Sequence, residues 1–149
     1  MISPDLDPYK LSIEDKVKLV QESDGLLIEL LENETIKDLY LEECFSLTHF
    51  PDGLSVLRHL DLRKCYSLTH IPDGLVKGYL YLEECTSLTH LPEGLSVKGN
   101  LFLIGCSSLT HLPEGLSVAG NLYLIGCTSL PYKTKEDLPK SIKIGGEIY

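Results

Sequence analysis

The sequence NLFLIGCSSLTHLPEGLSV, at residues 100–118, carries a pattern that the rest of the chain repeats. In general form the repeating unit is xxxLxLxxCxSLTHLPxGLxV, where x stands for any residue. Its cysteine recurs at intervals of 21, 20, 21 and 21 residues, at Cys44, Cys65, Cys85, Cys106 and Cys127. Self-similarity at such a fixed period is the sequence signature of a repeat architecture.

Each unit is predicted to form a short strand followed by a turn. Leu101 and Leu103 alternate with Phe102 and Ile104, which is the period-two pattern of a strand with one buried face. The proline and glycine after the cysteine bend the chain back, so that one coil closes in about 21 residues. A unit of this size cannot bury its own leucines, so successive coils must stack around one shared core. We therefore expect a curved solenoid whose strands pair in parallel.

The spaced leucines and the cysteine resemble a leucine-rich repeat (LRR), in which such leucines are followed by Asn or Cys. The resemblance covers roughly residues 36–130 and rests on Leu39, Leu41, Cys44; Leu60, Leu62, Cys65; Leu80, Leu82, Cys85; Leu101, Leu103, Cys106; and Leu122, Leu124, Cys127. The half-turn SLTHLPxGL is similar to that of cysteine-bearing LRRs in plant resistance proteins and in effectors of intracellular bacteria. The resemblance implies an α/β repeat fold with a parallel concave β-sheet, a short irregular convex side and a helical N-terminal cap. It also implies recognition of another protein on the concave sheet.

The chain divides into a helical cap at residues 1–35, five repeats of 20–21 residues at 36–130, and a C-terminal cap at 131–149. Ser12 with Asp15 is an approximate capping box and predicts a helix near residues 12–23. Residues 26–32 fit a second short helix or an extra edge strand, and we favour the helix. The tail aligns with the repeat when Leu138, Ile142, Ile144 and Ile148 are matched to Leu112, Leu116, Val118 and Leu122. This alignment predicts a partial sixth strand that ends at Tyr149.

Composition limits the classes of partner. The 149 residues suit one domain, and the net charge of −9 would repel nucleic acid and anionic membrane surfaces. A partner protein with a basic or apolar patch is expected instead. The N-terminus lacks a secretory signal and no apolar run is long enough to span a membrane, so we expect a soluble, cytoplasmic protein. The five cysteines are an odd number at one repeat position, which favours reduced thiols that pack as small apolar groups.

Candidate binding residues lie in the strand positions that face away from the core. The position between the two strand leucines reads Tyr40, Asp61, Tyr81, Phe102 and Tyr123, with Tyr149 in the tail. The position two residues later reads Glu42, Arg63, Glu83, Ile104 and Ile125, and the next reads Glu43, Lys64, Glu84, Gly105 and Gly126. The sheet is thus predicted to be charged at its N-terminal end and apolar at its C-terminal end.

We expect an exposed apolar patch at this C-terminal end, of the kind that marks protein interfaces. The predicted partner-binding residues are Tyr40, Asp61, Arg63, Tyr81, Glu83, Glu84, Phe102, Ile104, Tyr123 and Ile125. The alternative interpretation is that the aromatic residues pack across strands and stabilise the sheet.

A second column consists of histidines: His49, His70, His90 and His111, each with a carboxylate three residues later at Asp52, Asp73, Glu93 and Glu114. Histidine beside carboxylate could bind zinc or respond to pH. One histidine per coil, however, gives a row of equivalent side chains rather than a converging tetrahedral site. We expect surface residues that hydrogen-bond their own turn, with no metal and no cofactor.

Catalysis is not expected, because every cysteine occupies a core position and the histidines lie away from any pocket. The predicted function is a non-catalytic protein-binding module that acts as an inhibitor or adaptor. By analogy with bacterial LRR effectors, the partner would be an enzyme or a fellow effector, and the protein would be delivered into the host cell cytosol. The alternative is a fragment of a receptor-type recognition LRR.

Overall fold

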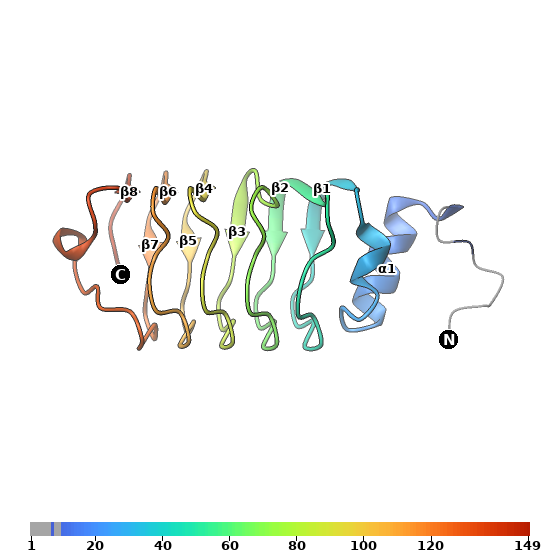
Figure 1. Ribbon diagram of the computed structural model, residues 1–149, viewed down its shortest axis with the longest axis horizontal. Helices are drawn as coiled ribbons and strands as arrows, with labels where there is room; N and C mark the ends of the chain where they lie inside the picture. The colour runs from blue at the N-terminus through green and yellow to red at the C-terminus, as the bar shows by residue number, and fades with distance from the viewer. Residues whose placement is uncertain (1–6, 8–9) are drawn as a thin grey trace.

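The computed structural model describes residue 7 and residues 10–149, which wind into a row of stacked coils (Figure 1). The helical elements are α1 (Ile13–Glu22) and the 3-10 helices η2 (Ile28–Leu31) and η3 (Lys135–Asp137). The strands are β1 (Thr35–Tyr40), β2 (Ser55–Asp61), β3 (Tyr79–Tyr81), β4 (Ser96–Val97), β5 (Leu101–Phe102), β6 (Ser117–Val118), β7 (Leu122–Tyr123) and β8 (Lys143–Ile144). The fold is a parallel β-solenoid with little helix, as the repeat pattern predicts.

Helix α1 closes the N-terminal end of the solenoid. Its first turn is capped by Ser12, whose Oγ accepts a hydrogen bond from the backbone N–H of Asp15 at 3.1 Å. After the helix, the Asp24 carboxylate accepts a hydrogen bond of 2.6 Å from the backbone N–H of Phe45 and so ties the cap to the first coil. The predicted N-terminal helix is confirmed.

After α1, the expected N-terminal cap continues with a second short helix. Residues 26–32, which the sequence allows to be helix or edge strand, contain the 3-10 helix η2. Ile28 and Leu31 of this helix are buried against the first coil and join the hydrophobic core. Residues 1–6 and 8–9 of the cap lie outside the described residues.

The main sheet keeps its strands in sequence order, β1-β2-β3-β5-β7, and all of them are parallel. The inward-pointing leucines of neighbouring strands lie side by side, as in the pairs Leu80↔Leu101 and Leu101↔Leu122. The C-terminus continues this sheet, because Tyr149 N–H donates to Leu122 O at 2.9 Å and Ile148 pairs with Leu122. At the place of the predicted partial strand, the tail thus forms an isolated parallel bridge to β7 rather than a further strand. The outward side of the main sheet is called the sheet face below.

A smaller parallel sheet, in the order β4-β6-β8, runs along the neighbouring side of the coil (Figure 1). Val97 pairs with Val118, and Val118 pairs with Ile144. The pairing of Val118 with Ile144 confirms the predicted alignment of the tail with the repeat. This sheet is not predicted from the sequence, where the stretch after the glycine indicates only a return of the chain to the core.

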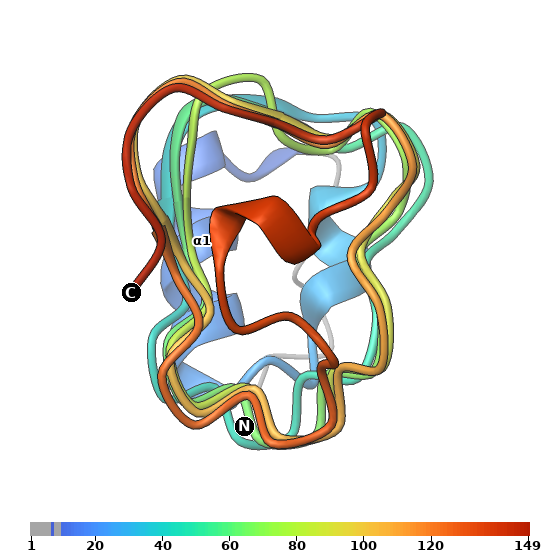
Figure 2. The same cartoon turned by 90° about the vertical axis from the view of Figure 1, so that its left-hand side faces the viewer.

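The coils stack in a nearly straight row rather than in the predicted curve, and they almost superimpose when viewed along the row (Figures 1 and 2). Away from the main sheet, neighbouring coils are also joined directly through their backbones. Thr89 N–H donates to Thr69 O at 3.0 Å, and Gly94 N–H donates to Glu114 O at 2.8 Å. The coils are thus about one strand spacing, roughly 4.8 Å, apart on both sides. Because the spacing between coils is the same on both sides, the row stays straight.

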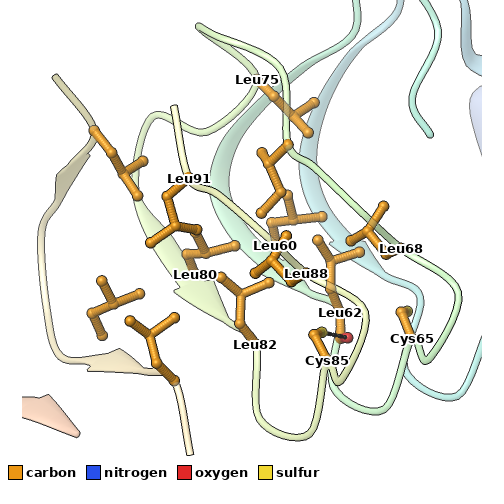
Figure 3. Close-up of a cluster of buried hydrophobic side chains, with 14 of the residues drawn as sticks. Leu60, Leu62, Cys65, Leu68, Leu75, Leu80, Leu82, Cys85, Leu88 and Leu91 are labelled. Carbon is orange, nitrogen blue, oxygen red and sulfur yellow. Dashed lines mark hydrogen bonds between the residues drawn. The ribbon is translucent and has the colours of Figure 1, made fainter. Parts of the chain in front are cut away.

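One continuous hydrophobic core runs through the coils. Leu60, Leu62, Leu80 and Leu82 point inward from the main sheet and meet Leu88 from the loop side (Figure 3). All of these side chains are fully buried. Each such leucine contributes on the order of 1.5–3 kcal/mol relative to an exposed one. The stacking of coils therefore supplies the burial that a single repeat lacks.

Replacing Leu82 with Ala should lower the free energy of unfolding by about 2–5 kcal/mol, because it opens a cavity between two coils. Urea unfolding followed by circular dichroism measures this loss. The control is Leu57→Ala on β2, a side chain that is about half exposed, for which a change below about 1 kcal/mol is expected. Equal losses in the two variants would contradict a shared core.

Candidate partner-binding site

The repeated cysteines form a column inside the solenoid. All are buried and free: Cys44, Cys65, Cys85, Cys106 and Cys127. Every thiol after the first donates a hydrogen bond to a backbone carbonyl of the preceding coil. Cys106 Sγ, for example, lies 3.1 Å from Leu82 O, and Cys127 Sγ lies 2.9 Å from Leu103 O. The prediction of reduced, inward thiols is confirmed. Each thiol is also a second donor to a carbonyl that already accepts a backbone N–H in its own turn, a bond that the repeat pattern does not predict.

Burial keeps these thiols protonated. It raises the pKa of Cys44 and Cys127 to about 11 and that of Cys65 and Cys106 to about 12, and it raises the pKa of Cys85 as well. A catalytic cysteine needs the opposite shift, toward the thiolate. The cysteine column therefore has the chemistry of a structural element rather than of a nucleophile.

The raised thiol pKa values predict that the protein loses stability in alkaline solution. Between the unfolded thiol pKa of roughly 8.5 and the higher folded value, the unfolded chain releases protons that the folded chain retains. The free energy of unfolding should thus be fully retained below about pH 8 and then fall by about 1.4 kcal/mol per thiol for each pH unit. Urea unfolding at a series of pH values measures this slope.

The matched variant is Cys106→Ala, which should start less stable but show a shallower alkaline slope, by about one thiol. Val97→Ala is the control, because it removes buried apolar surface without removing a thiol. A slope that is unchanged in Cys106→Ala would contradict the assignment.

The sheet face carries a row of stacked aromatic rings. The ring centroid of Phe102 lies 6.0 Å from that of Tyr81 and 4.7 Å from that of Tyr123, and Tyr149 continues the row 5.0 Å beyond Tyr123. Neighbouring ring planes differ by only 10°, 12° and 18°. Cross-strand packing of the aromatics, the alternative interpretation from the sequence, is thus present. Tyr40 is half exposed and takes no part in this row.

Three of these rings, together with two isoleucines, form an apolar strip at the C-terminal end of the sheet face. Ile125 is 60% exposed and Tyr149 is 55% exposed, whereas Phe102, Ile104 and Tyr123 are half-buried. The sequence predicts an exposed patch, and Phe102 and Tyr123 are less exposed than expected because each stacked ring covers part of its neighbour. We call these five residues the apolar strip.

The N-terminal half of the sheet face is covered by ion pairs. Arg58 donates two hydrogen bonds to the Asp38 carboxylate, through Nε at 2.9 Å and Nη2 at 2.5 Å, and His59 Nδ1 lies 2.7 Å from the same carboxylate. The hydrogen bonds from Arg58, and a smaller effect of His59, hold the pKa of Asp38 well below its usual range. In the next column Lys64 Nζ pairs with Glu43 Oε1 at 3.0 Å.

The prediction that Asp61 faces solvent is wrong, because the residue is only 5% exposed. The cause is Arg63, two residues later, whose guanidinium folds back over the carboxylate. Arg63 Nη2 lies 2.6 Å from Asp61 Oδ2 and 3.1 Å from Glu42 Oε2, and Asp61 in turn raises the pKa of Arg63. Asp61 and Arg63 are thus occupied by one another within the sheet face.

Glu83 and Glu84 of the third repeat lie in the turn just beyond β3 rather than in strand positions, where the charged and apolar halves meet. Glu83 is half-buried, burial raises its pKa, and its Oε2 is the buried side-chain oxygen without a hydrogen-bond partner in the described part of the chain. Glu84 is exposed. Neither carboxylate forms an ion pair within residues 10–149.

Sequence reasoning missed other aromatic contacts at the sheet. His59 stacks on Tyr79 with ring centroids 4.9 Å apart, and Phe45 stacks on Tyr66 at 5.3 Å. Both pairs join residues 20 or 21 positions apart, so the repeat period could have identified them. They were not predicted because, in the later repeats, the equivalent positions hold residues that are not aromatic.

The histidine column lies on the side of the coil away from the main sheet, along an open groove of about 640 Å³. In each coil a hydrogen bond joins the histidine Nδ1 to the preceding threonine Oγ1, at 2.9–3.2 Å. This confirms that the histidines bond within their own turn. The rings of His70 and His90 stack with centroids 5.8 Å apart and planes within 7°, so their nitrogens do not converge. Among the described residues, no group of three His, Cys, Asp or Glu could hold a metal ion.

Zinc titration followed by calorimetry should therefore give no heat above that of buffer. The physical reason is that parallel imidazoles with one nitrogen already bonded cannot form a tetrahedral site. A variant with His70→Ala and His90→Ala should give the same result as the unchanged protein. Saturable heat that is lost in this variant would contradict the interpretation.

These observations define the chain as a solenoid repeat protein whose sheet face ends in an apolar strip. Comparisons with protein-family models, with curated proteins and with solved structures give no match. In the described residues, no helix is both long and apolar enough to cross a membrane.

Proposed function

We propose that the chain is a leucine-rich-repeat protein that binds a partner protein through its sheet face and acts as an inhibitor or adaptor. The assignment to leucine-rich repeats is supported by the leucine and cysteine spacing together with the inward column of hydrogen-bonded thiols. The parallel sheet in sequence order is in keeping with it.

The observation that carries the protein-binding proposal is the apolar strip. Ile125 and Tyr149 leave more than half of their surfaces exposed on a flat sheet, next to the rings of Phe102 and Tyr123. Contiguous apolar and aromatic surface of this kind is typical of the centre of a protein interface. The ion pairs beside it are suited to form the polar rim.

A role without catalysis is in keeping with the chemistry of the described residues. The thiols are buried and protonated, and the histidines bond to threonines in a row rather than to a nucleophile. Such a module can act by occupying a surface of an enzyme or of a fellow effector. Delivery into a host cytosol rests only on the resemblance to bacterial LRR effectors, and a receptor-type recognition module would use the same face.

The test is affinity capture from bacterial and host lysates with mass spectrometry, comparing the unchanged protein with the double variant Tyr123→Asp, Ile125→Arg. Placing charges in the interface centre should weaken capture of the specific partner by at least about tenfold. The matched control is Leu57→Arg, Tyr66→Asp, which makes the same kinds of change at exposed positions of the second repeat. Equal capture by all three proteins would exclude the apolar strip as the binding surface.

A further inference from the structure

We propose that the partner inserts an arginine side chain over Ile104, beside Glu83 and Glu84. This inference rests on the proposed function and names the chemistry of the partner at one point of the sheet face. It follows from two neighbouring columns of the repeat. In the second repeat these columns hold the cations Arg63 and Lys64, whereas in the fourth repeat the same positions hold Ile104 and Gly105.

The first step is the register between coils. Glu43 N–H donates to Arg63 O at 2.9 Å, and Glu84 N–H donates to Ile104 O at 2.7 Å. Ile104 therefore stands one coil beyond Glu83 in the same way that Arg63 stands one coil beyond Glu42. In the second repeat this position holds a guanidinium that bonds to the preceding carboxylate.

The second step is the charge that remains. In one column Arg63 forms ion pairs with Glu42 and Asp61, and in the other Lys64 forms an ion pair with Glu43. The third repeat adds two more carboxylates, and the fourth repeat brings Ile104 and Gly105 instead of cations. Arg63 and Lys64 also attract Glu83 and Glu84 from the preceding coil, but these two cations face five carboxylates, Glu42, Glu43, Asp61, Glu83 and Glu84. On their other side Glu83 and Glu84 meet Ile104 and Gly105, which leaves a local excess of negative charge at the edge of the apolar strip.

The third step is the surface that an incoming cation would meet. Phe102 precedes Ile104 by two residues, and its ring is half-buried between those of Tyr81 and Tyr123. A guanidinium is planar, stacks on aromatic rings and binds carboxylates through two nitrogens, whereas an ammonium does neither as well. Arginine is therefore the side chain that fits both the ring and the carboxylates.

The fourth step is that the rest of the occupant must be apolar. Ile125 and Tyr149 continue the strip beyond Ile104, and free arginine or a small cation would leave them exposed. A protein segment with apolar residues flanking the arginine covers both surfaces at once. The net charge of −9 also favours the approach of a basic segment over an acidic one.

The test uses the extended peptide acetyl-Leu-Ser-Arg-Ser-Leu-amide, titrated into the whole chain at low ionic strength and followed by the backbone amide NMR signals of residues 102–105. The comparison peptide has citrulline, the neutral analogue of arginine, at the central position. We expect the arginine peptide to bind at least about tenfold more tightly than the citrulline peptide, because charge-assisted hydrogen bonds are lost in the latter. Equal binding of both peptides, or no saturable shift with the arginine peptide, would overturn the proposal.

The variant Glu83→Gln, Glu84→Gln should reduce the preference for arginine to about twofold or less. Its matched control is Glu93→Gln, Glu114→Gln, which removes the same charge from exposed turns away from the sheet face. Loss of the preference in the control to the same extent would show that only net charge matters and would overturn a specific site.

A second variant supplies the cation within the chain. Ile104→Arg should place a guanidinium beside Glu83 as Arg63 lies beside Glu42, and should abolish the preference for the arginine peptide. Ile104→Gln is the neutral control. It should still bind the arginine peptide at least about threefold more tightly than the citrulline peptide, because it adds no cation beside the carboxylates. If partner capture depends on Tyr123 and Ile125 but the unchanged protein and its Glu83, Glu84 and Ile104 variants all show the same ratio of affinities for the two peptides, the arginine site is wrong while the protein-binding function stands.

Discussion

Each coil is hydrogen-bonded to the next through its backbone at a constant offset of 20 or 21 residues, and the other features of the solenoid depend on this register. A parallel ladder sets neighbouring strands about 4.8 Å apart, so a residue type that recurs with the repeat is stacked on its own kind. Leucines stacked in this way form a core, thiols meet carbonyls of the preceding coil, and aromatic rings lie face to face. An acidic or basic residue meets whatever charge the neighbouring coil presents. The properties of the sheet face are therefore properties of columns rather than of single residues.

This dependence explains which features could be predicted from the sequence. The parallel order of the strands and the inward leucines follow from the period, and both are observed. The pairing of Ile144 with Val118, which is also observed, follows from matching the apolar residues of the tail to those of the repeat. The straightness of the row could not be predicted, because it depends on the width of the chain on the side away from the sheet. That width is set by backbone bonds such as Thr89 to Thr69, which the repeat pattern does not encode.

The candidate site was predictable at the level of columns but not of side-chain conformation. The stacked row from Tyr81 to Tyr123 follows from the aromatic column, since rings one strand apart must touch. The burial of Asp61 does not, because it results from the direction in which the long side chain of Arg63 folds. The thiol bonds were missed for a similar reason. The carbonyls that the thiols reach already accept a backbone N–H within their own turn, as Leu82 O does from Cys85 at 3.2 Å, so the repeat pattern does not call for a second donor.

The stacking of the rings has a consequence for binding that follows from entropy. A side chain that must be immobilised on binding costs roughly 0.5–1.5 kcal/mol. Phe102 has a ring on each side of it, so this ordering has already taken place when the protein folds. Glu84, by contrast, is exposed and must be ordered by the partner. On the proposed function, the apolar strip would therefore supply affinity from a rigid surface. The carboxylates at its edge would add specificity at a higher entropic cost, which is worth incurring only for a partner that offers them a well-placed cation.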